Sequence, residues 1–197
     1  MTEGLFDQDD DGNTLLTAEE REGLKLTYVT TRGELNDAEN ANIGKAAAWV
    51  MSGRRRRTLD VDFLRRLHKR MLGEVWDWAG QYRRSDKNIG IPHRQIEMAM
   101  HELIGNLNAW TEYKSYEPDE IAIRFAHRLV QIHPFPNGNG RHSRLAADIL
   151  IMSWGRKTFT WGRAGLVSGD RTRATYIEAL KAADRNEFGP LIAFARS

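Results

Sequence analysis

Residues 133–144 interrupt two strongly helical patterns with two prolines and two glycines, and this break constrains the fold more than any other segment. The break begins at His133, which precedes a proline, so we expect its backbone to turn extended and to end the preceding helix. Gly138 and Gly140 flank Asn139 and allow positive φ angles, so that backbone N–H groups can turn to one side. The segment therefore predicts two helices joined by a tight loop, with an anion-binding nest where the second helix starts.

Arg141 and Arg144 follow this loop three residues apart, so they share one face of the second helix, whereas His142 points elsewhere. Their guanidinium groups can grip phosphate oxygens in bidentate fashion. A neutral His133 beside them can take a proton from an attacking hydroxyl while the nest and the arginines stabilise charge on the phosphate. The residues thus indicate transfer of a phosphate-linked group. The alternative is a glycine-rich turn with a structural histidine and two surface arginines.

The same segment resembles the signature of the Fic family, in which a histidine and a phenylalanine precede an acidic residue, Gly-Asn-Gly-Arg and a second arginine. The resemblance implies transfer of AMP from ATP to a hydroxyl side chain of a target protein, with pyrophosphate leaving. It implies that His133 deprotonates the hydroxyl and that Phe135 anchors the loop in the core. It also implies that Arg144 reaches the γ-phosphate and that the α- and β-phosphates are held by Gly138, Asn139, Gly140 and Arg141.

Asn137 departs from the family pattern, because it occupies the position of the acidic residue that holds Mg²⁺ against the phosphates. Asparagine offers a neutral carbonyl oxygen, whereas Mg²⁺ prefers carboxylates and phosphate oxygens. The resemblance implies Mg²⁺ as a cofactor, and the departure leaves three alternatives open. The enzyme is slow, or the nucleotide itself holds most of the Mg²⁺, or the site transfers a different group.

Residues 30–36 resemble the family's inhibitory motif, a Ser or Thr followed four residues later by Glu. The resemblance implies that Glu34 contacts Arg144 and blocks productive seating of the γ-phosphate. Leu35 departs from the motif, which has Gly or Asn there. Thr31 and Glu34 also have the spacing of a capping box, so Glu34 can instead cap the helix that follows. The two roles do not exclude each other.

Residues 81–91 carry two short apolar stretches around a polar turn and predict a β-hairpin. This segment matches the position of the family's flap, which the resemblance implies pairs with the target through Asn88, Ile89 and Gly90. Strand addition relies on backbone bonds, so the flap does not identify the target protein. An ordinary surface hairpin is the alternative.

The resemblance covers residues 14–197, and the chain looks most like a Fic branch known as mobile mystery protein B, which bacterial mobile elements encode. Three functions remain open. The first is a protein adenylyltransferase restrained in cis by Glu34. The second uses the same site to remove AMP or to move another phosphate-linked group. The third is a catalytically weak nucleotide-binding regulator that pairs with a DNA-binding protein from the same element, which Asn137 favours.

Composition agrees with one compact domain of 197 residues without cysteine, compatible with a reducing cytoplasm. A net charge of +2 and 41% hydrophobic residues without a long apolar run argue against a nucleic-acid binder and a membrane protein. The run Arg54–Arg57 is best interpreted as a solvated connection between helices. The histidines lack the spacing of a zinc site. The sequence carries no signal for an oligomeric state.

The hydrophobic periodicity predicts a mainly α fold in a single Fic-type helical bundle. We expect residues 1–16 to form a flexible N-terminal extension and residues 17–197 to form the domain, with the inhibitory-type helix around 30–51. Helices are expected at about 33–51, 60–72, 96–110, 118–132, 139–154, 172–183 and 190–195, preceded by a short helix capped by Thr17 and Glu20.

Overall fold

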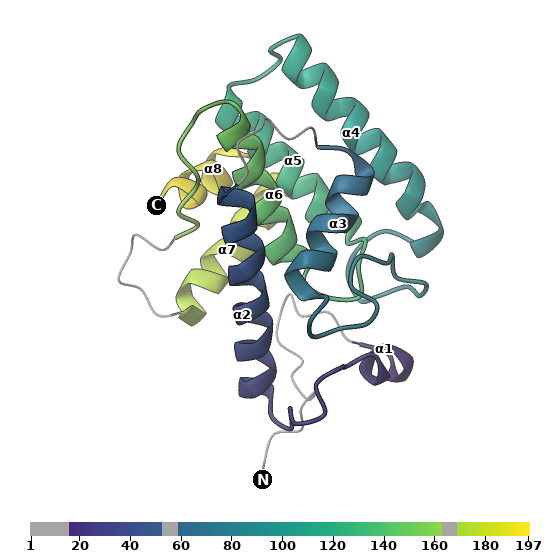
Figure 1. The fold of residues 1–197 in the computed structure, drawn as a ribbon. Coiled ribbons are helices and arrows are strands. Elements are labelled where there is room, and N and C mark those ends of the chain that lie inside the picture. Colours follow the sequence, from purple (N-terminus) through teal and green to yellow (C-terminus); the bar gives the residue numbers. More distant parts are fainter. Residues whose placement is uncertain (1–15, 53–58, 163–168) are drawn as a thin grey trace.

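The computed structural model describes residues 16–52, 59–162 and 169–197, and these residues fold almost entirely into helices (Figure 1). The mainly α architecture expected from the periodicity is confirmed. Residues 1–15 of the expected N-terminal extension and the run Arg54–Arg57 lie outside the described residues. The helices are α1 (Ala18–Glu22), α2 (Arg32–Met51), α3 (Val61–Leu72), a 3₁₀ turn (His93–Gln95), α4 (Ile96–Glu112), α5 (Pro118–Ile132), α6 (Asn139–Ser153), α7 (Gly169–Asp184) and α8 (Gly189–Arg196).

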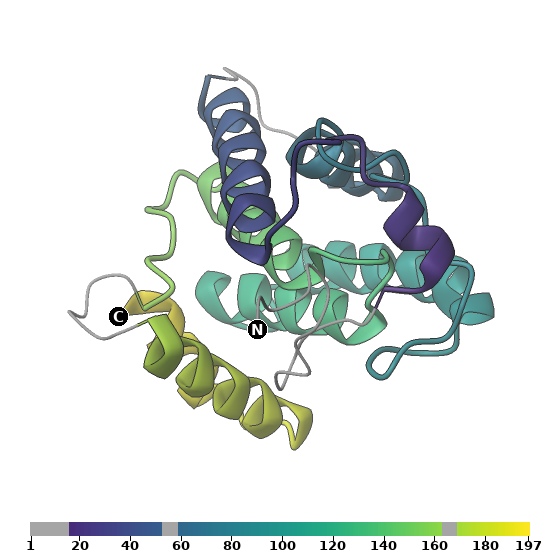
Figure 2. The ribbon, with the colours of Figure 1, turned by 90° about the horizontal axis from the view of Figure 1, so that it is seen from below.

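Helices α5 and α6 pack along each other at the centre of the molecule. Figure 2 shows them between α2 and α3 on one side and α7 and α8 on the other. Helix α5 starts with a proline at a favoured first-turn position and two acidic residues that suit the helix dipole. Its apolar residues recur at helical spacing and are buried, and α6 meets them with the small buried residues Ala146 and Ala147. The loop between these two helices therefore sits on a rigid pair.

His133 ends α5 in the left-handed conformation, with φ 54° and ψ 58°, so the expectation of extended geometry at this residue is wrong. A following proline disfavours only the right-handed helical region, and two neighbouring groups favour the tighter turn. The N–H of His133 still donates to the carbonyl of Leu129 at 3.3 Å. Arg83 donates through Nε to the carbonyl oxygen of His133 at 2.7 Å. The chain thus turns sharply at the signature histidine.

The flap, residues 81–91, has no strand pairing in the part of the chain that the structure describes, so the expected β-hairpin is wrong as regular structure. Its carbonyl groups are used differently. The carbonyl oxygens of Ser85 and Ile91 accept from the guanidinium of Arg83, and Asp86 accepts from the backbone N–H of His93 at 2.7 Å. The segment is therefore an irregular loop organised by side chains rather than by a ladder of backbone bonds.

No helix among residues 16–52, 59–162 and 169–197 combines the length and the apolar character that crossing a bilayer requires.

Candidate active site

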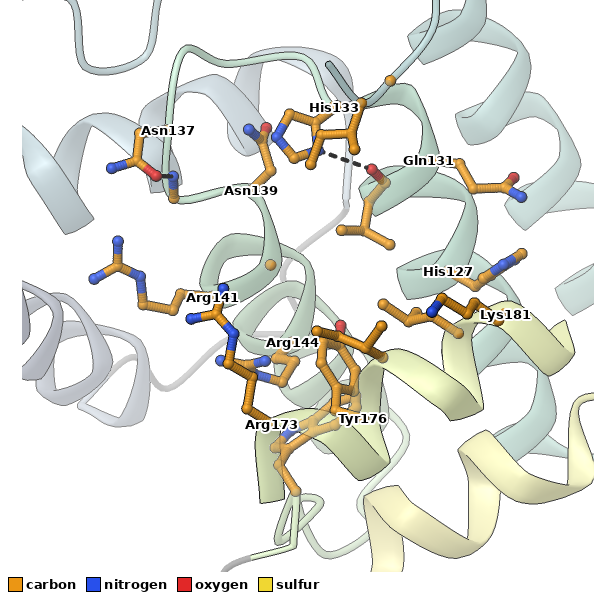
Figure 3. A pocket seen from close by; sticks show the side chains of 18 of the residues that line it. His127, Gln131, His133, Asn137, Asn139, Arg141, Arg144, Arg173, Tyr176 and Lys181 are labelled. Carbon is orange, nitrogen blue, oxygen red and sulfur yellow. Dashed lines mark hydrogen bonds between the residues drawn. The ribbon is translucent and has the colours of Figure 1, made fainter. Parts of the chain in front are cut away.

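One cavity of about 970 Å³ lies beside the signature loop, which we define as residues 133–138. Its wall also includes the first turn of α6, the start of α2, the end of the flap and one face of α7. Figure 3 shows Asn137 and Arg141 on one side of the view and Lys181 on the other, with His133 and Arg144 between them. The volume is at the upper end of the range of small-molecule and cofactor sites.

His133 is buried, with 5% of its surface exposed, and lines the cavity. Its Nδ1 lies 3.2 Å from the carbonyl oxygen of Val130, the contact drawn as a dashed line in Figure 3. When Nδ1 carries the proton of this bond, Nε2 carries the lone pair of the neutral ring. Burial lowers the pKa of His133 to about 4, and the nearby charges of Arg83 and Lys87 act in the same direction. The ring is therefore neutral at pH 7 and able to accept a proton.

The side chain of Phe135, in the signature loop, is fully buried. Its ring stacks on the imidazole of His68 with a centroid distance of 3.7 Å. His68 accepts from the backbone N–H of Gly80 at Nδ1, so Nε2 carries its proton and donates to the carbonyl oxygen of Asn137 at 3.0 Å. Burial holds the pKa of His68 well below its usual value. A neutral histidine on α3 thus braces the loop from behind.

Asn139 closes the loop upon itself through two side-chain bonds. Its Oδ1 accepts from the backbone N–H of Phe135 at 2.9 Å, and its Nδ2 donates to the carbonyl oxygen of the same residue at 2.8 Å. The side chain is buried, so both bonds form away from water. The side chain of Asn139 therefore shapes the loop, and its backbone N–H is the group that remains for a phosphate.

The N-terminus of α6 opens into the cavity without a side-chain cap. Gly138 precedes the helix with φ 78°, and a Cβ at this position would lie 2.5 Å from Cδ1 of Leu72, so only glycine fits. The first bond of the helix joins the N–H of His142 to the carbonyl of Gly138 at 2.9 Å. The N–H groups of Asn139, Gly140 and Arg141 precede that bond and lie at the open end of the helix. Gly138 has the positive φ expected from the sequence, whereas Gly140 is helical, so that part of the expectation is wrong.

Arg141 forms an ion pair with Glu39 of α2, with 2.7 Å between Nη2 and Oε2. The carboxylate of Glu39 is buried, and its Oε1 accepts from Nε1 of the buried Trp76 at 2.7 Å. The arginine itself is partly exposed and lines the cavity. A guanidinium has five N–H donors, so one edge can be held by Glu39 while another meets a phosphate. Sequence reasoning missed Glu39, because its partners are far from it along the chain.

Arg144 lies on α6 one turn beyond Arg141, and its guanidinium stands over the ring of Tyr176 on α7, 5.0 Å from the centroid. Tyr176 also lines the cavity, which sequence reasoning did not anticipate. The two signature arginines are therefore brought to one site, but a carboxylate holds the first and an aromatic face supports the second.

Glu34 caps its own helix in this structure. Its Oε2 accepts from the backbone N–H groups of Thr30 at 2.8 Å and Thr31 at 3.0 Å, and Thr31 Oγ1 accepts from the N–H of Glu34 at 3.3 Å. These backbone bonds lower the pKa of Glu34. The capping box expected from the sequence is confirmed. No ion pair joins Glu34 to Arg144 within the described residues.

Asn137 is a weak candidate ligand for a metal ion. Its Oδ1 accepts from the N–H of Gly138 at 2.7 Å, so the one oxygen that could bind a cation is turned to the loop's own backbone. Within the described residues, no three His, Cys, Asp or Glu side chains gather as a metal ion would require. The position of the family's acidic residue therefore offers one neutral oxygen, already hydrogen-bonded, in place of the carboxylate that Mg²⁺ prefers.

The flap reaches the cavity through Ile89 and Gly90, next to the exposed Asn88. Gly90 has φ 101°, and a Cβ there would lie 2.6 Å from Cβ of His133 and 2.9 Å from Nη2 of Arg83. The backbone of the flap at Gly90 therefore packs so closely against His133 that it leaves no room for a side chain. Arg83, which sequence reasoning also missed, lies between them.

Comparison with known proteins places these residues in a family. The Fic/DOC family model matches residues 58–151. Curated relatives include the protein adenylyltransferase Fic of Aedes aegypti, 27% identical over 197 residues, and that of Drosophila melanogaster, 29% identical over 196 residues. Each match covers 93% of this chain and 37% of the relative, so the chain spans little more than a third of the length of these proteins.

Solved structures share the fold. The N-terminal Fic domain of Bep8 from Bartonella sp. 1-1C superposes with a TM-score of 0.70 at 14% identity, covering 89% of this chain and 90% of that one. BepC of Bartonella tribocorum, with bound AMPPNP, superposes with a TM-score of 0.67 at 20% identity, covering 91% and 97%. The helical arrangement agrees with these proteins, and residues 58–151 of the chain match the Fic/DOC family.

Proposed function

We propose that this protein is a protein adenylyltransferase, which transfers AMP from ATP to a hydroxyl side chain of a target protein. The proposal rests on one observation: a neutral buried histidine, the open N-terminus of α6 and two arginines line the same cavity. A nucleotide triphosphate supplies the negative charge that such a cavity would bind. The named activity of the relatives and the AMPPNP bound to a structural neighbour support the same choice.

The chemistry follows from where the groups lie. The hydroxyl oxygen of the target attacks the α-phosphorus of ATP, and its proton passes to Nε2 of His133. The bond between the α-phosphorus and the bridging oxygen breaks, and pyrophosphate leaves with the electron pair. The N–H groups at the start of α6 and the guanidinium of Arg141 stabilise the charge that develops on the phosphates, while Arg144 binds the γ-phosphate. No step of this scheme relies on a metal ion held by Asn137.

We further propose that Glu34 restrains the reaction. Its neighbours Arg32 and Asn36, on the same first turn of α2, line the cavity into which Arg144 also projects. A carboxylate that left Thr30 and Thr31 would meet the cation meant for the γ-phosphate. Because the cap occupies Glu34 in this structure, the restraint requires that the carboxylate exchange its backbone partners for Arg144.

The test uses four proteins: the unmodified chain, Glu34→Gly, His133→Ala, and the double variant. Each is incubated with α-³²P-ATP, Mg²⁺ and a bacterial lysate, and labelled proteins are separated on a gel. Transfer is expected to rise in Glu34→Gly and to vanish in both proteins that lack His133, since a positioned general base contributes about 10²–10⁴-fold. Near-normal labelling by His133→Ala would remove the assignment of the base. Equal labelling by the unmodified chain and Glu34→Gly would leave Glu34 as a cap only.

Two other functions use the same cavity. In the first, the site removes AMP or transfers a different phosphate-linked group, which the same gel assay detects with pre-labelled protein or with other labelled nucleotides. In the second, the protein is a nucleotide-binding regulator, favoured by the engagement of Asn137 with Gly138. A regulator would bind ATP and melt at a higher temperature in its presence, yet would label nothing even as Glu34→Gly. Asn137→Asp, which restores a carboxylate, would raise Mg²⁺-dependent transfer in an enzyme and leave a regulator silent.

A further inference from the structure

Arg83 is a residue of the flap, and its fully buried side chain contacts both the flap and the signature loop through one guanidinium. Nη1 donates to the carbonyl oxygen of Ser85 at 2.8 Å, and Nη2 donates to that of Ile91. Nε donates to the carbonyl oxygen of His133 at 2.7 Å. Nη2 also lies 3.5 Å from the carbonyl oxygen of Ile132. Four carbonyl groups, two in the flap and two at the end of α5, therefore converge on one side chain.

Arg83 donates hydrogen bonds to carbonyl groups at the C-terminal end of α5. The last carbonyl groups of a helix have no partner within the helix, and here the chain turns into the left-handed region and then into a proline, which has no N–H to offer. A cation at this end also suits the negative end of the helix dipole. The backbone of Arg83 adds one more bond, from its N–H to the carbonyl of Pro134 at 2.9 Å. Arg83 therefore holds both sides of His133 in place.

The flap fits onto this arrangement through Gly90. Its backbone passes so close to His133 and Arg83 that a Cβ would overlap both side chains. The position of the flap and the position of the histidine are thus set by the same guanidinium. Lys87 is held separately by its ion pair with Glu20 of α1, and Asp86 by the N–H of His93, whereas Arg83 joins the flap to the signature loop.

We propose that Arg83 is a positioning residue of the transfer site, which registers the target-binding flap against His133 and holds the imidazole in its reactive orientation. This inference rests on the proposed adenylyl transfer. Arg83 does not touch the nucleotide cavity, so its loss leaves nucleotide binding intact and disturbs the alignment of the hydroxyl with the base. Misplacement of a reacting group by about 1 Å is enough to slow a reaction about 100-fold.

Arg83→Lys is the first variant, because lysine keeps the charge but cannot extend a planar fork to carbonyl groups in three directions. Arg84→Lys is the matched control, since Arg84 is the next residue in the chain and is exposed. Arg83→Ala, with and without added methylguanidinium, is the second variant, because a free guanidinium can occupy the space that the side chain leaves.

Two measurements decide the proposal without any transfer reaction. Correlation of the histidine ring nitrogens with their carbon-bound protons by NMR reports the tautomer and the pKa of His133, and amide hydrogen exchange reports the order of residues 84–91. In Arg83→Lys we expect a mixed tautomer, a pKa of His133 that rises above its value of about 4 as the ring gains water, and flap exchange faster by about tenfold or more. Arg83 and Lys87 each place a positive charge near His133, and a positive charge remains at both positions in this variant.

Transfer and nucleotide binding complete the test. We expect ATP affinity within about twofold of the unmodified chain and transfer at saturating ATP lower by about 10–100-fold in Arg83→Lys. Arg84→Lys should match the unmodified chain, and methylguanidinium should restore the tautomer of Arg83→Ala. Unchanged histidine signals and flap exchange in a folded Arg83→Lys would overturn the proposal. So would a variant that fails to fold, because Arg83 would then hold the whole domain. If the unmodified chain labels nothing, the proposed function fails, and the NMR and exchange results still decide the role of Arg83.

Discussion

The N-termini of α2 and α6 both face the same cavity, but one has a side-chain cap and the other has none. At the first turn of α2, the Thr31 hydroxyl caps the N–H of Glu34, and the Glu34 carboxylate lies at the helix end, where it accepts from the N–H groups of Thr30 and Thr31. The first turn of α6 starts at a left-handed glycine without a side-chain cap. Each N-terminus carries about half a positive charge from the aligned peptide dipoles. At α2 a carboxylate of the chain already lies against that charge, whereas the α6 end presents its charge and its N–H groups to the cavity.

The difference shows that one helix N-terminus is stabilised by the chain itself, whereas the other is left open for a ligand. At α2 the sequence provides a carboxylate within reach of the helix end, so no external anion is needed there. At α6 the equivalent side chains are used elsewhere: Asn139 bonds to Phe135, and Asn137 bonds to the N–H of Gly138. The start of α6 is therefore open to an anion because the side-chain oxygens of Asn137 and Asn139 bond to the backbone of the loop instead of capping the helix.

Substitution of Gly138 should have the largest effect, because it changes the shape of the open N-terminus of α6. Gly138→Ala places a methyl group against Leu72 at a positive φ angle, which costs about 1–2 kcal/mol for the backbone alone. We expect a lower melting temperature and a loss of ATP affinity of about tenfold or more, since the nest cannot keep its shape. The matched control is Gly140→Ala, where a Cβ meets no atom within 4 Å. This change should stabilise the helix by about 0.5–1 kcal/mol. Equal effects of the two substitutions, measured by thermal denaturation and calorimetric titration with ATP, would contradict the role of Gly138.

Glu39 connects the two helix ends, and its removal should have the next largest effect. Glu39→Gln keeps an acceptor for Trp76 but removes the charge that pairs with Arg141. We expect a loss of about 1–3 kcal/mol in the free energy of unfolding, since a buried hydrogen-bonded charge is lost while its partner stays partly desolvated. Glu74→Gln is the control, because its ion pair with Lys45 is exposed and should contribute about 0–1 kcal/mol. Urea denaturation of both variants measures the difference, and equal losses would show that the contact of Glu39 with Arg141 is no stronger than a surface pair.

Much of the fold could be predicted from the sequence, because the helices carry apolar residues at regular spacing. The bounds of α5 and α6 follow from Pro118 and from the glycines of the signature. The flap could not be predicted, because its apolar residues alternate like a strand while its carbonyl groups bond to the side chain of Arg83. The backbone of His133 was misjudged for the same reason. Its conformation depends on a residue fifty positions earlier in the chain.

The candidate site was predictable where its residues are local in sequence. The signature supplies His133, Phe135 and the two arginines within twelve residues, and all of them lie around the loop and its cavity. Glu39, His68 and Arg83 escaped detection because each acts through a contact with a distant segment. None of them belongs to a motif, and each is buried only in the folded chain. A glutamate, a histidine and an arginine without tertiary context resemble ordinary helix and loop residues.

The buried histidines of the signature and the cap of α2 should also contribute to the stability of the protein in different pH windows. Burial lowers the pKa of both His133 and His142 to about 4, while the unfolded chain binds protons near the usual value of about 6.5. Their contribution is complete above pH 6.5 and is lost as pH falls from there towards 4, because only the unfolded state gains protons in this interval. The cap of Glu34, whose pKa is lowered by the Thr30 and Thr31 N–H groups, is lost only below about 4.5. A melting temperature that stays constant between pH 7 and pH 5 would contradict the burial of the histidines.

Glu34→Gln should have the smallest effect on stability and is the sharpest probe of the α2 end. Glutamine also serves at this position of a capping box, because its amide oxygen can accept from the same N–H groups of Thr30 and Thr31. The melting temperature is therefore expected to stay nearly unchanged, whereas Glu34→Gly loses the cap and should melt earlier. A neutral amide cannot hold Arg144 as a carboxylate would, so labelling from α-³²P-ATP should rise in Glu34→Gln as much as in Glu34→Gly if Glu34 acts by charge. Labelling that rises only in Glu34→Gly would instead assign the change to a loosened helix end.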